Sequence, residues 1–301
     1  MFKYKYLIFF IAIILLFLKA NAGIITGAQQ TQAYLPLIKG KNISLVVNQT
    51  SMIGEKHLVD SLLSLNIRIK KIFAPEHGFR GDHGAGEKIK STIDTKTGLP
   101  IISLYGEHKK PTLADLNETD IVIFDIQDVG ARFYTYISTL HYVMEACAEL
   151  NKELIILDRP NPNGHYVDGP VLDMKFKSFV GMHPVPVVHG MTIGEYAKMI
   201  NGEKWLLNGV QCKLKIIELK NYTHDSMYRL PVRPSPNLPT MGSIYLYPSL
   251  CFFEGTNYSV GRGTDKPFEC LGKPGMTQGN YRFIPRSVAG VADHPPFEGK
   301  E

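Results

Sequence analysis

Short apolar runs alternate with amphipathic segments between residue 35 and about residue 190. Several of these runs are almost continuous Val, Ile and Leu, which is typical of strands buried on both faces. The segments between them carry apolar residues at helical spacing, most regularly over residues 57–65 and 133–150. Strands that alternate with helices predict βαβ units and a mostly parallel α/β sheet. The expected strands are residues 43–48, 67–73, 100–103, 121–125, 154–157 and 185–188.

Polar clusters follow five of the expected strands. Because the carboxyl ends of parallel strands meet at one edge of a sheet, these clusters are expected to converge on a single crevice, where α/β folds bind ligands. A random solvated surface would not place its polar groups only after strands. The clusters are Asn48 to Thr50, Glu76 and His77, Tyr105 to His108, Asp125 to Asp128, and Asp158 to Asn161.

The pattern changes after residue 190. Thr192 and Glu195 have the spacing of a capping box and predict a helix through about residue 201, and residues 210–218 are expected to form a strand. The proline-rich residues 230–239 predict an ordered, extended loop that crosses the crevice. Residues 281–301 lack a closing element, so we expect an incomplete, smaller α+β domain over residues 236–301, after a catalytic domain over residues 23–235.

The densest cluster is the glycine-rich stretch from Phe73 to Glu87, which holds the pairs Glu76-His77 and Asp82-His83. A carboxylate beside an imidazole on a bent loop suits acid–base chemistry on a polar substrate. The alternative is an ordinary solvent-exposed loop in which Glu76 caps a helix or pairs with Arg80. The density of the cluster favours a functional loop, with Glu76 and His77 as catalytic candidates.

Asp125 and Asp128 are candidates for a second carboxylate, which glycoside hydrolysis usually requires. Gln127 between them could face the same substrate. Either aspartate could instead cap a helix that starts near Gly130.

Arginines and aromatic residues near the crevice indicate what it binds. Arg132, Arg159, Arg233 and Arg262 lie in expected loops, and an arginine fork recognises a carboxylate, so several together suggest an anionic substrate. Structural pairing with Asp158, Asp168 or Asp265 is the alternative for each single arginine. The run Phe133-Tyr134-Thr-Tyr136 could stack on a sugar or form ordinary core.

Several cofactor signatures are missing from the sequence. His77, Asp82 and His83 could ligate a metal, but no recognised ligand spacing is present. There is no phosphate loop, no GxGxxG after the first strand, and no GxSxG elbow. We therefore expect no metal and no cofactor.

Residues 1–22 have the features of a cleaved signal peptide: early lysines, an apolar run and the small-x-small site Ala20-Asn21-Ala22. An uncleaved anchor is the alternative, although the run is short for a membrane span. The chain carries 33 Lys+Arg and 28 Asp+Glu, and removal of this segment takes away three lysines and no acid. The near balance gives no support for nucleic-acid binding. Cys251 and Cys270 could pair in an oxidising compartment.

Several long motifs, in order along the chain, resemble one family, the exo-β-N-acetylmuramidases of the NamZ type. The motifs are Phe73-Ala-Pro-Glu-His-Gly-Phe-Arg-Gly, Asp125-Ile-Gln-Asp-Val-Gly-Ala-Arg-Phe-Tyr-Thr-Tyr, Leu157-Asp-Arg-Pro-Asn-Pro-Asn-Gly, Pro234-Ser-Pro-Asn-Leu-Pro-Thr and Phe253-Glu-Gly-Thr-Asn-Tyr-Ser-Val-Gly-Arg-Gly-Thr.

The resemblance implies a Rossmann-like domain, a smaller C-terminal domain, and a site between them. It also implies removal of N-acetylmuramic acid from the non-reducing ends of peptidoglycan fragments, outside the cytoplasm, with Glu76 as the leading acid. The competing hypotheses are a non-catalytic muropeptide-binding protein and a metal-dependent amidase or deacetylase. The residues expected to bind substrate are Asn48, Arg80, Gln127, Arg132, Tyr134, Arg159, Asn161, Asn237, Glu254 and Arg262.

Overall fold

A computed structural model describes residues 23–80 and 92–301 of the chain. The expected signal peptide and the residues Asp82, His83 and Glu87 of the polar loop lie outside the described residues.

The described part of the chain contains a seven-stranded sheet in the order β5-β6-β4-β1-β7-β8-β9. All neighbouring pairs are parallel except β5 with β6. Without β5, the parallel strands follow the order 3-2-1-4-5-6 along the chain, which is the Rossmann order. The strands are β1 (Asn42–Val47), β4 (Arg68–Ala74), β5 (Thr92–Ile93), β6 (Pro100–Ser103), β7 (Ile121–Asp125), β8 (Glu153–Leu157) and β9 (Lys213–Ile217), beside a separate antiparallel pair, β2 (Met52–Ile53) and β3 (Lys56–His57).

Alternate residues of the central strands enter two separate cores. In β7, Ile121 and Ile123 pack on one side of the sheet, and Val122 and Phe124 pack on the other. This period of two follows from the pleat of a strand, and it explains why β7 is apolar at every position before Asp125. The expected mostly parallel sheet with helices on both faces is therefore confirmed.

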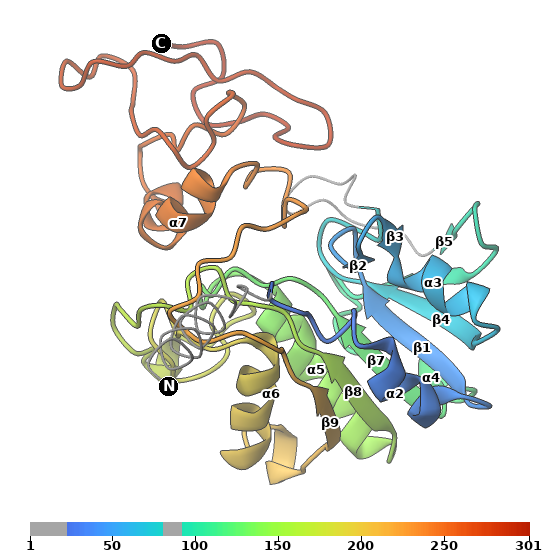
Figure 1. Cartoon of the computed structure of the whole chain (residues 1–301). Helices are drawn as coiled ribbons and strands as arrows, with labels where there is room; N and C mark the ends of the chain where they lie inside the picture. Colours follow the sequence, from blue (N-terminus) through green and yellow to red (C-terminus); the bar gives the residue numbers. More distant parts are fainter. Residues whose placement is uncertain (1–22, 81–91) are drawn as a thin grey trace, which may run out of the picture.

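Helices cover both faces of the sheet (Figure 1). Side chains of α2 and α3 belong to one core, and those of α4, α5 and α6 belong to the other. The capping box expected at the start of α6 is present, because Glu195 N donates to Thr192 Oγ1 over 3.2 Å and Thr192 N donates to Glu195 Oε2 over 2.9 Å. The helices are α2 (Thr31–Ile38), α3 (Leu58–Ser64), α4 (Leu113–Leu116), α5 (Tyr136–Glu149), α6 (Ile193–Gly202) and α7 (Met241–Leu250), with 3-10 turns η1 (Met174–Phe176), η2 (Leu207–Gly209) and η3 (Cys251–Gly255).

The strand expected over residues 185–188 is wrong. Val188 makes only isolated bridges, to Ala131 and Asp168. Pro184 and Pro186 lack the N–H groups that a strand inside a sheet must donate, and β9 takes the place beside β8 instead.

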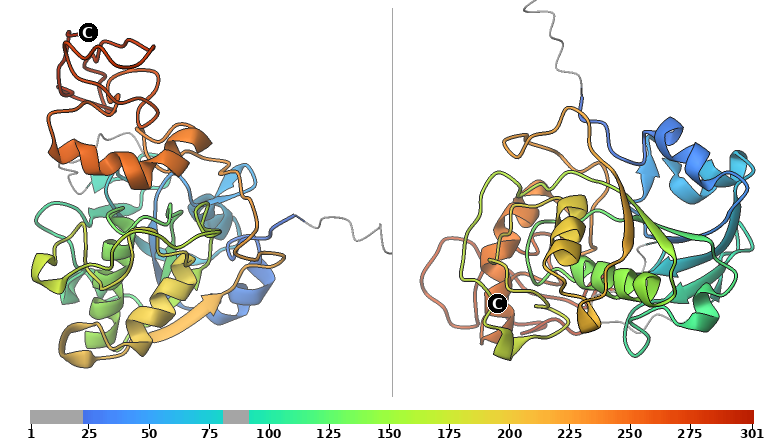
Figure 2. Two further views of the ribbon diagram at one scale, coloured as in Figure 1. Left: turned by 90° about the vertical axis from the view of Figure 1, so that its left-hand side faces the viewer. Right: turned by 90° about the horizontal axis from the view of Figure 1, so that it is seen from below.

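The C-terminal residues lie over one end of the α/β domain (Figures 1 and 2). α7 crosses that end, and the loops after it extend away from the sheet. Residues 230–239 form neither helix nor strand, as expected. In the described chain no named strand follows β9, so the region expected to be α+β consists of α7, η3, loops and two isolated bridges.

Two smaller expectations concern membranes and thiols. None of the helices in the described ranges combines the length and apolar character needed to cross a bilayer. Cys251 and Cys270 are free thiols in the structure, so the pairing considered for them is not present.

Candidate active site

A tight turn after β4 presents Glu76. Gly78 N donates to Pro75 O over 3.0 Å, and His77 at the third position of this turn has a φ of 70°. A positive φ is unfavourable for a residue with a side chain, and such strain is held where the surroundings over-determine it, often at functional sites. His77 is buried. The turn therefore holds Glu76 at the carboxyl edge of the sheet in one fixed orientation.

Hydroxyl groups from two other loops contact the Glu76 carboxylate. Thr135 Oγ1, just before α5, donates to Glu76 Oε2 over 2.6 Å. The pKa of Tyr105, after β6, is raised to about 12 by burial and then by the charge of Glu76 and a hydrogen bond with it. Loops that follow β4, β6 and β7 thus meet at this carboxylate, as the convergence of strand ends predicts.

Glu76 lines a cavity of about 360 Å³, which we call the inner chamber. Most of its wall is made by buried side chains, so the chamber ends inside the protein. Its walls come from the β4 turn, the start of α5 and the C-terminal residues. The lining residues are Glu76, His77, Phe133, Tyr134, Thr135, Ser235, Asn237, Leu238, Tyr247, Arg262 and Phe268.

A second cavity, of about 770 Å³, adjoins the first and is called the outer chamber. Two of its lining residues, Val180 and Phe252, are more than half exposed. Glu76, Phe133, Thr135 and Tyr247 line both chambers, so Glu76 lies at the junction between them. The residues particular to the outer chamber are Val180, Cys251, Phe252 and Glu254.

An ion pair links the two chambers. Arg262, which lines the inner chamber, donates from Nε to Glu254 Oε1 over 2.5 Å, and Glu254 lines the outer chamber. The Arg262 guanidinium also lies 5.0 Å from the Phe268 ring centroid. Gly263, which follows Arg262, has a φ of 78°, and a Cβ there would lie 2.3 Å from Arg286 O. Only glycine fits this bend, which positions the arginine.

Asp125 and Arg159 form a buried pair with each other. Arg159 Nε and Nη2 donate to the Asp125 carboxylate over 2.6 and 2.9 Å, and both residues are almost fully buried. Burial lowers the pKa of Arg159, but the Asp125 charge and these hydrogen bonds outweigh burial and raise it. The structure places neither side chain in the two chambers.

Asp128 also lies apart from the chambers. Its Oδ2 accepts from Gly130 N over 2.7 Å, so it caps a turn and not α5, which begins at Tyr136. His189 Nε2 is 3.9 Å from the same oxygen. Burial raises the pKa of Asp128 to about 7 and lowers the pKa of His189 to about 3.

Asn48, Gln127 and Asn161 brace the loops of the sheet edge. Asn48 Oδ1 accepts from Thr50 N and Oγ1 over 2.9 and 2.6 Å. Gln127 Nε2 donates to the Asp128 and Pro160 carbonyls over 2.8 and 2.7 Å, and Asn161 Nδ2 donates to Met191 O over 2.9 Å. These amides hold backbone groups in place and do not line either chamber.

The remaining arginines expected at the site have other partners. Arg80 pairs with Asp94 over 2.9 Å and not with Glu76. Arg132 Nη1 donates to the carbonyls of Pro170 and Val185 over 2.7 and 2.6 Å. Of the residues expected to act on or bind substrate, the structure brings together Glu76, His77, Tyr134, Asn237, Glu254 and Arg262.

Sequence reasoning missed several residues of the chambers. Thr135 had a signal, because it lies between Tyr134 and Tyr136 in the aromatic run that the sequence analysis placed near the crevice. Tyr247 and Phe268 had none, since α7 shows no polar cluster and the 268 loop is not adjacent to any expected strand. Phe252 could have been noticed only as an apolar residue beside Glu254.

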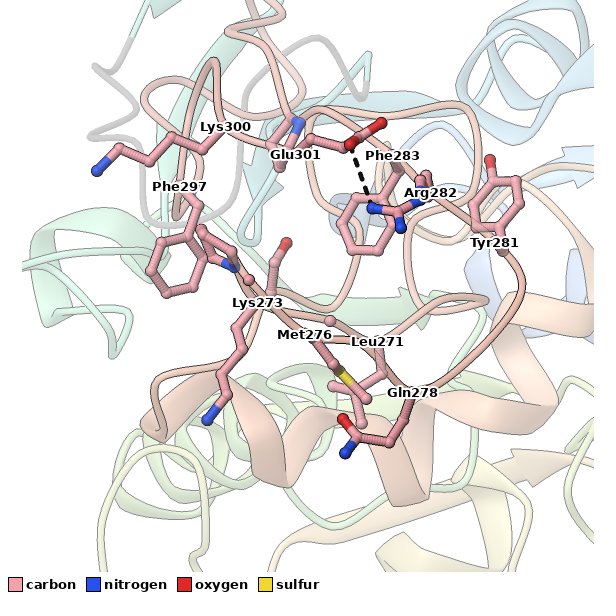
Figure 3. A pocket seen from close by; sticks show the side chains of 15 residues that line it. Leu271, Lys273, Met276, Gln278, Tyr281, Arg282, Phe283, Phe297, Lys300 and Glu301 are labelled. Carbon is pink, nitrogen blue, oxygen red and sulfur yellow. Dashed lines mark hydrogen bonds and ion pairs between the residues drawn. The ribbon is translucent and has the colours of Figure 1, made fainter.

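A separate cavity of about 500 Å³ lies within the C-terminal loops (Figure 3). Tyr281, Phe283 and Phe297 line it together with Lys273 and other residues. The carboxylate among its described lining residues is Glu301, which pairs with Arg282 over 3.3 Å. It lacks the carboxylate at a strand end that distinguishes the two chambers above.

The metal alternative concerns the described residues, 23–80 and 92–301. There, no group of three or more His, Cys, Asp or Glu side chains is arranged to hold a metal ion. His77 is among these residues, whereas Asp82 and His83 are not.

The fold and the chambers define an α/β protein with a Rossmann-ordered sheet, whose polar site lies between the sheet edge and a C-terminal region. The family models described as the N-terminal and C-terminal parts of the exo-beta-N-acetylmuramidase NamZ match residues 43–242 and 245–292. The chain belongs to this family.

Relatives of known name or structure agree with this assignment. The peptidoglycan beta-N-acetylmuramidase NamZ of Bacillus subtilis strain 168 is 46% identical over 248 residues, which are 80% of this chain and 59% of that protein. The chain thus spans about three fifths of that relative's length. Two crystal structures of DUF1343 family proteins from Bacteroides fragilis match with TM-scores of 0.86 and 0.77 at 55% and 34% identity. They cover 93% and 84% of this chain, and 75% and 66% of their own.

Proposed function

We propose that this chain is an exo-acting glycoside hydrolase that releases N-acetylmuramic acid from the non-reducing ends of peptidoglycan fragments. The observation that carries the proposal is the position of Glu76 at the junction of two adjoining chambers. A carboxyl group that borders two adjoining cavities can give its proton to the oxygen that links sugars bound in them. The activity in the printed name of the Bacillus subtilis relative supports the same reaction.

The inner chamber suits the terminal sugar. It ends against buried side chains, with Glu76 at its junction with the outer chamber. A glycan could enter it only by its end, which accounts for exo action. The aromatic rings of Tyr134, Tyr247 and Phe268 offer apolar surface to a sugar, and Arg262 offers a cation to the lactyl carboxylate of muramic acid.

Glycoside hydrolysis usually needs two carboxyl groups of the enzyme, one of them as the acid for the leaving oxygen. In the proposed mechanism Glu76 protonates the leaving oxygen as the bond to the anomeric carbon breaks, and a water molecule then supplies the hydroxyl group on that carbon and the proton that Glu76 gave up. Thr135 and Tyr105 hold the carboxyl group in place. Glu254 faces the outer chamber with Glu76, so two carboxylates border the same space. Paired carboxylates are the usual equipment of glycoside hydrolases.

Two substrates test the role of Glu76. The first is para-nitrophenyl N-acetylmuramide, whose leaving group departs without a proton, and the second is the disaccharide N-acetylmuramyl-N-acetylglucosamine, whose leaving group needs one. We expect Glu76→Gln to lower kcat/KM on the disaccharide by at least about 100-fold and on the nitrophenyl substrate by much less.

The matched control is Glu118→Gln. Glu118 is a surface residue that precedes β7, at the opposite edge of the sheet, and pairs with Lys70 over 3.8 Å. Glu118→Gln should leave kcat/KM unchanged on both substrates. Wild-type protein that binds muropeptides but releases neither product would overturn the proposal in favour of a non-catalytic binding protein. Inactivation by chelators would instead favour a metal-dependent amidase or deacetylase.

We propose further that the chain is exported, because residues 1–22 carry the signal-peptide features described above and the substrate is a cell-wall polymer. Mass spectrometry of the protein from its native host should find a mature chain that begins at Gly23 outside the cytoplasm. A cytoplasmic protein that retains Met1 to Ala22 would contradict export without affecting the enzymatic proposal.

A further inference from the structure

We propose that Phe252, with Val180 and Phe133, forms the binding surface for the sugar on the leaving side of the scissile bond, and that this sugar is uncharged. The inference rests on the proposed function, because it takes Glu76 as the point of cleavage. It assigns the outer chamber to N-acetylglucosamine and the inner chamber to the anionic muramyl residue.

Exposed apolar side chains in the outer chamber are the first observation. Phe252 is 56% exposed and Val180 is 54% exposed, and both line the chamber that Glu76 borders. Large apolar groups left in solvent beside a polar site commonly mark a binding surface. An aromatic ring and a branched aliphatic side chain fit the apolar face of a pyranose and the methyl group of an acetamide.

The aromatic surface is continuous and rigid. The ring of Phe133 lies edge-to-face with Phe252 at 5.5 Å and with Tyr247 at 5.3 Å between centroids. Because Phe133 and Tyr247 line both chambers, the aromatic wall runs without a break from the inner chamber to Phe252. Such pairs fix the rings before a ligand arrives, which lowers the entropic cost of binding.

Hydrogen bonds hold the turn that carries Val180. Ser138 Oγ of α5 donates to Phe179 O over 2.6 Å. Ser178 and Gly181 exchange backbone hydrogen bonds of 2.9 and 3.1 Å around the same turn. Val180 therefore lies on a turn pinned to α5, which also carries Thr135 at its N-cap.

Charge separates the two chambers. Arg262 lines the inner chamber, whereas none of the described residues lining the outer chamber is a lysine or an arginine. The inner chamber also contains the Glu76 carboxyl group beside Arg262, whereas the outer chamber contains the carboxyl groups of both Glu76 and Glu254. An anionic sugar is therefore less disfavoured beside Arg262 in the inner chamber than between two carboxyl groups in the outer one. This difference sets the direction in which a disaccharide enters.

The test compares two substrates that differ only on the leaving side. N-Acetylmuramyl fluoride has a single leaving atom, and N-acetylmuramyl-N-acetylglucosamine has a whole sugar. We expect Phe252→Ala to lower kcat/KM on the disaccharide about tenfold, chiefly through KM, and to leave the fluoride unchanged. Phe252→Trp should restore most of the loss.

Phe176→Ala is the matched control. Phe176 is 65% exposed on η1 and does not line either chamber, so its removal should change neither rate. Equal effects of Phe252→Ala on both substrates, or no effect on either, would overturn the inference. If the wild-type protein cleaved neither substrate, the proposed function would fail.

A binding measurement keeps the inference testable in that case. In the Glu76→Gln background, adding Phe252→Ala should raise the Kd of the disaccharide about tenfold and leave the Kd of N-acetylmuramic acid unchanged, by calorimetry. An unchanged disaccharide Kd would refute the inference. Acidic substitution of the leaving sugar, as in a muramyl-muramic acid disaccharide, should weaken binding further.

Discussion

Replacing Arg159 by methionine tests whether the Asp125–Arg159 pair supports the fold or the chemistry. The pair is almost fully buried, and the guanidinium makes two hydrogen bonds to the carboxylate and one, of 3.2 Å, to Met52 O. Arg159→Met introduces an apolar side chain of similar length. It leaves the buried Asp125 carboxylate without its partner. Breaking a buried ion pair from one side typically costs about 3–5 kcal/mol of unfolding free energy. We expect a loss of that size.

Urea denaturation of three variants measures the loss. Arg159→Met alone should show the full effect. Adding Asp125→Asn removes the stranded charge and should recover at least about 2 kcal/mol, because the coupling between contacting groups is then absent. Lys198→Met is the control, since its pair with Glu218 is more than half exposed on both sides and should cost at most about 1 kcal/mol.

Steady-state kinetics of the folded protein distinguish a structural role of Arg159 from a role in substrate binding. If Arg159 binds the substrate carboxylate, Arg159→Met should unfold at the wild-type urea concentration while KM for the muramyl substrate rises strongly. That outcome would refute the structural reasoning and return Arg159 to the substrate site. Loss of stability with KM nearly unchanged would support it.

Two further predictions concern Thr135 and Asp128. Thr135→Val removes the hydroxyl that donates to Glu76 and should lower kcat/KM on the disaccharide about tenfold, whereas Thr135→Ser should retain most activity; equal activity in all three proteins would contradict a positioning role. For Asp128, the folded pKa of about 7 lies above its ordinary value of 3.8, so the folded protein holds this proton while the unfolded chain releases it. The contribution of Asp128 to wild-type stability should therefore fall, by at most about 4 kcal/mol, as pH rises from 4 to 7. The free energy of unfolding of Asp128→Asn, measured with urea, should rise relative to that of the wild type over this pH range. A constant difference between the two proteins would contradict the raised pKa of Asp128.

The sheet was largely predictable because its strands are buried on both faces. Residues 43–48 and 121–125 are apolar at nearly every position, and they form β1 and β7 within one residue of the expected limits. The short strands β2, β3 and β5 were not predicted, since two residues show no period. α7 was missed for a different reason: it contains Gly242 and Pro248 and lacks a clear polar face.

The site was predictable only in part, because a sequence shows which polar residues follow strands but not which of them face one another. Glu76 follows β4 and Asp125 ends β7, and the sequence identified both as catalytic candidates. In the folded chain, Asp125 meets Arg159 from the adjacent strand, whereas Glu76 meets hydroxyl groups and a cavity. That difference depends on strand order and side-chain direction, which pattern alone does not fix.

The same packing explains why the candidate site lies beside the usual ligand position of this fold. A Rossmann-ordered sheet normally binds ligands between the ends of its first and fourth parallel strands, here β1 and β7. In this chain those two ends bond to each other: Gln127 N donates to Thr50 Oγ1 over 3.0 Å, and Ser51 Oγ donates to Asp125 O. Protein groups therefore occupy this crevice. The two chambers lie instead beside the strained turn after β4, which carries Glu76, and below the C-terminal residues, which supply Arg262 and Phe252. The C-terminal region is therefore needed to complete the site, and not only to cover it.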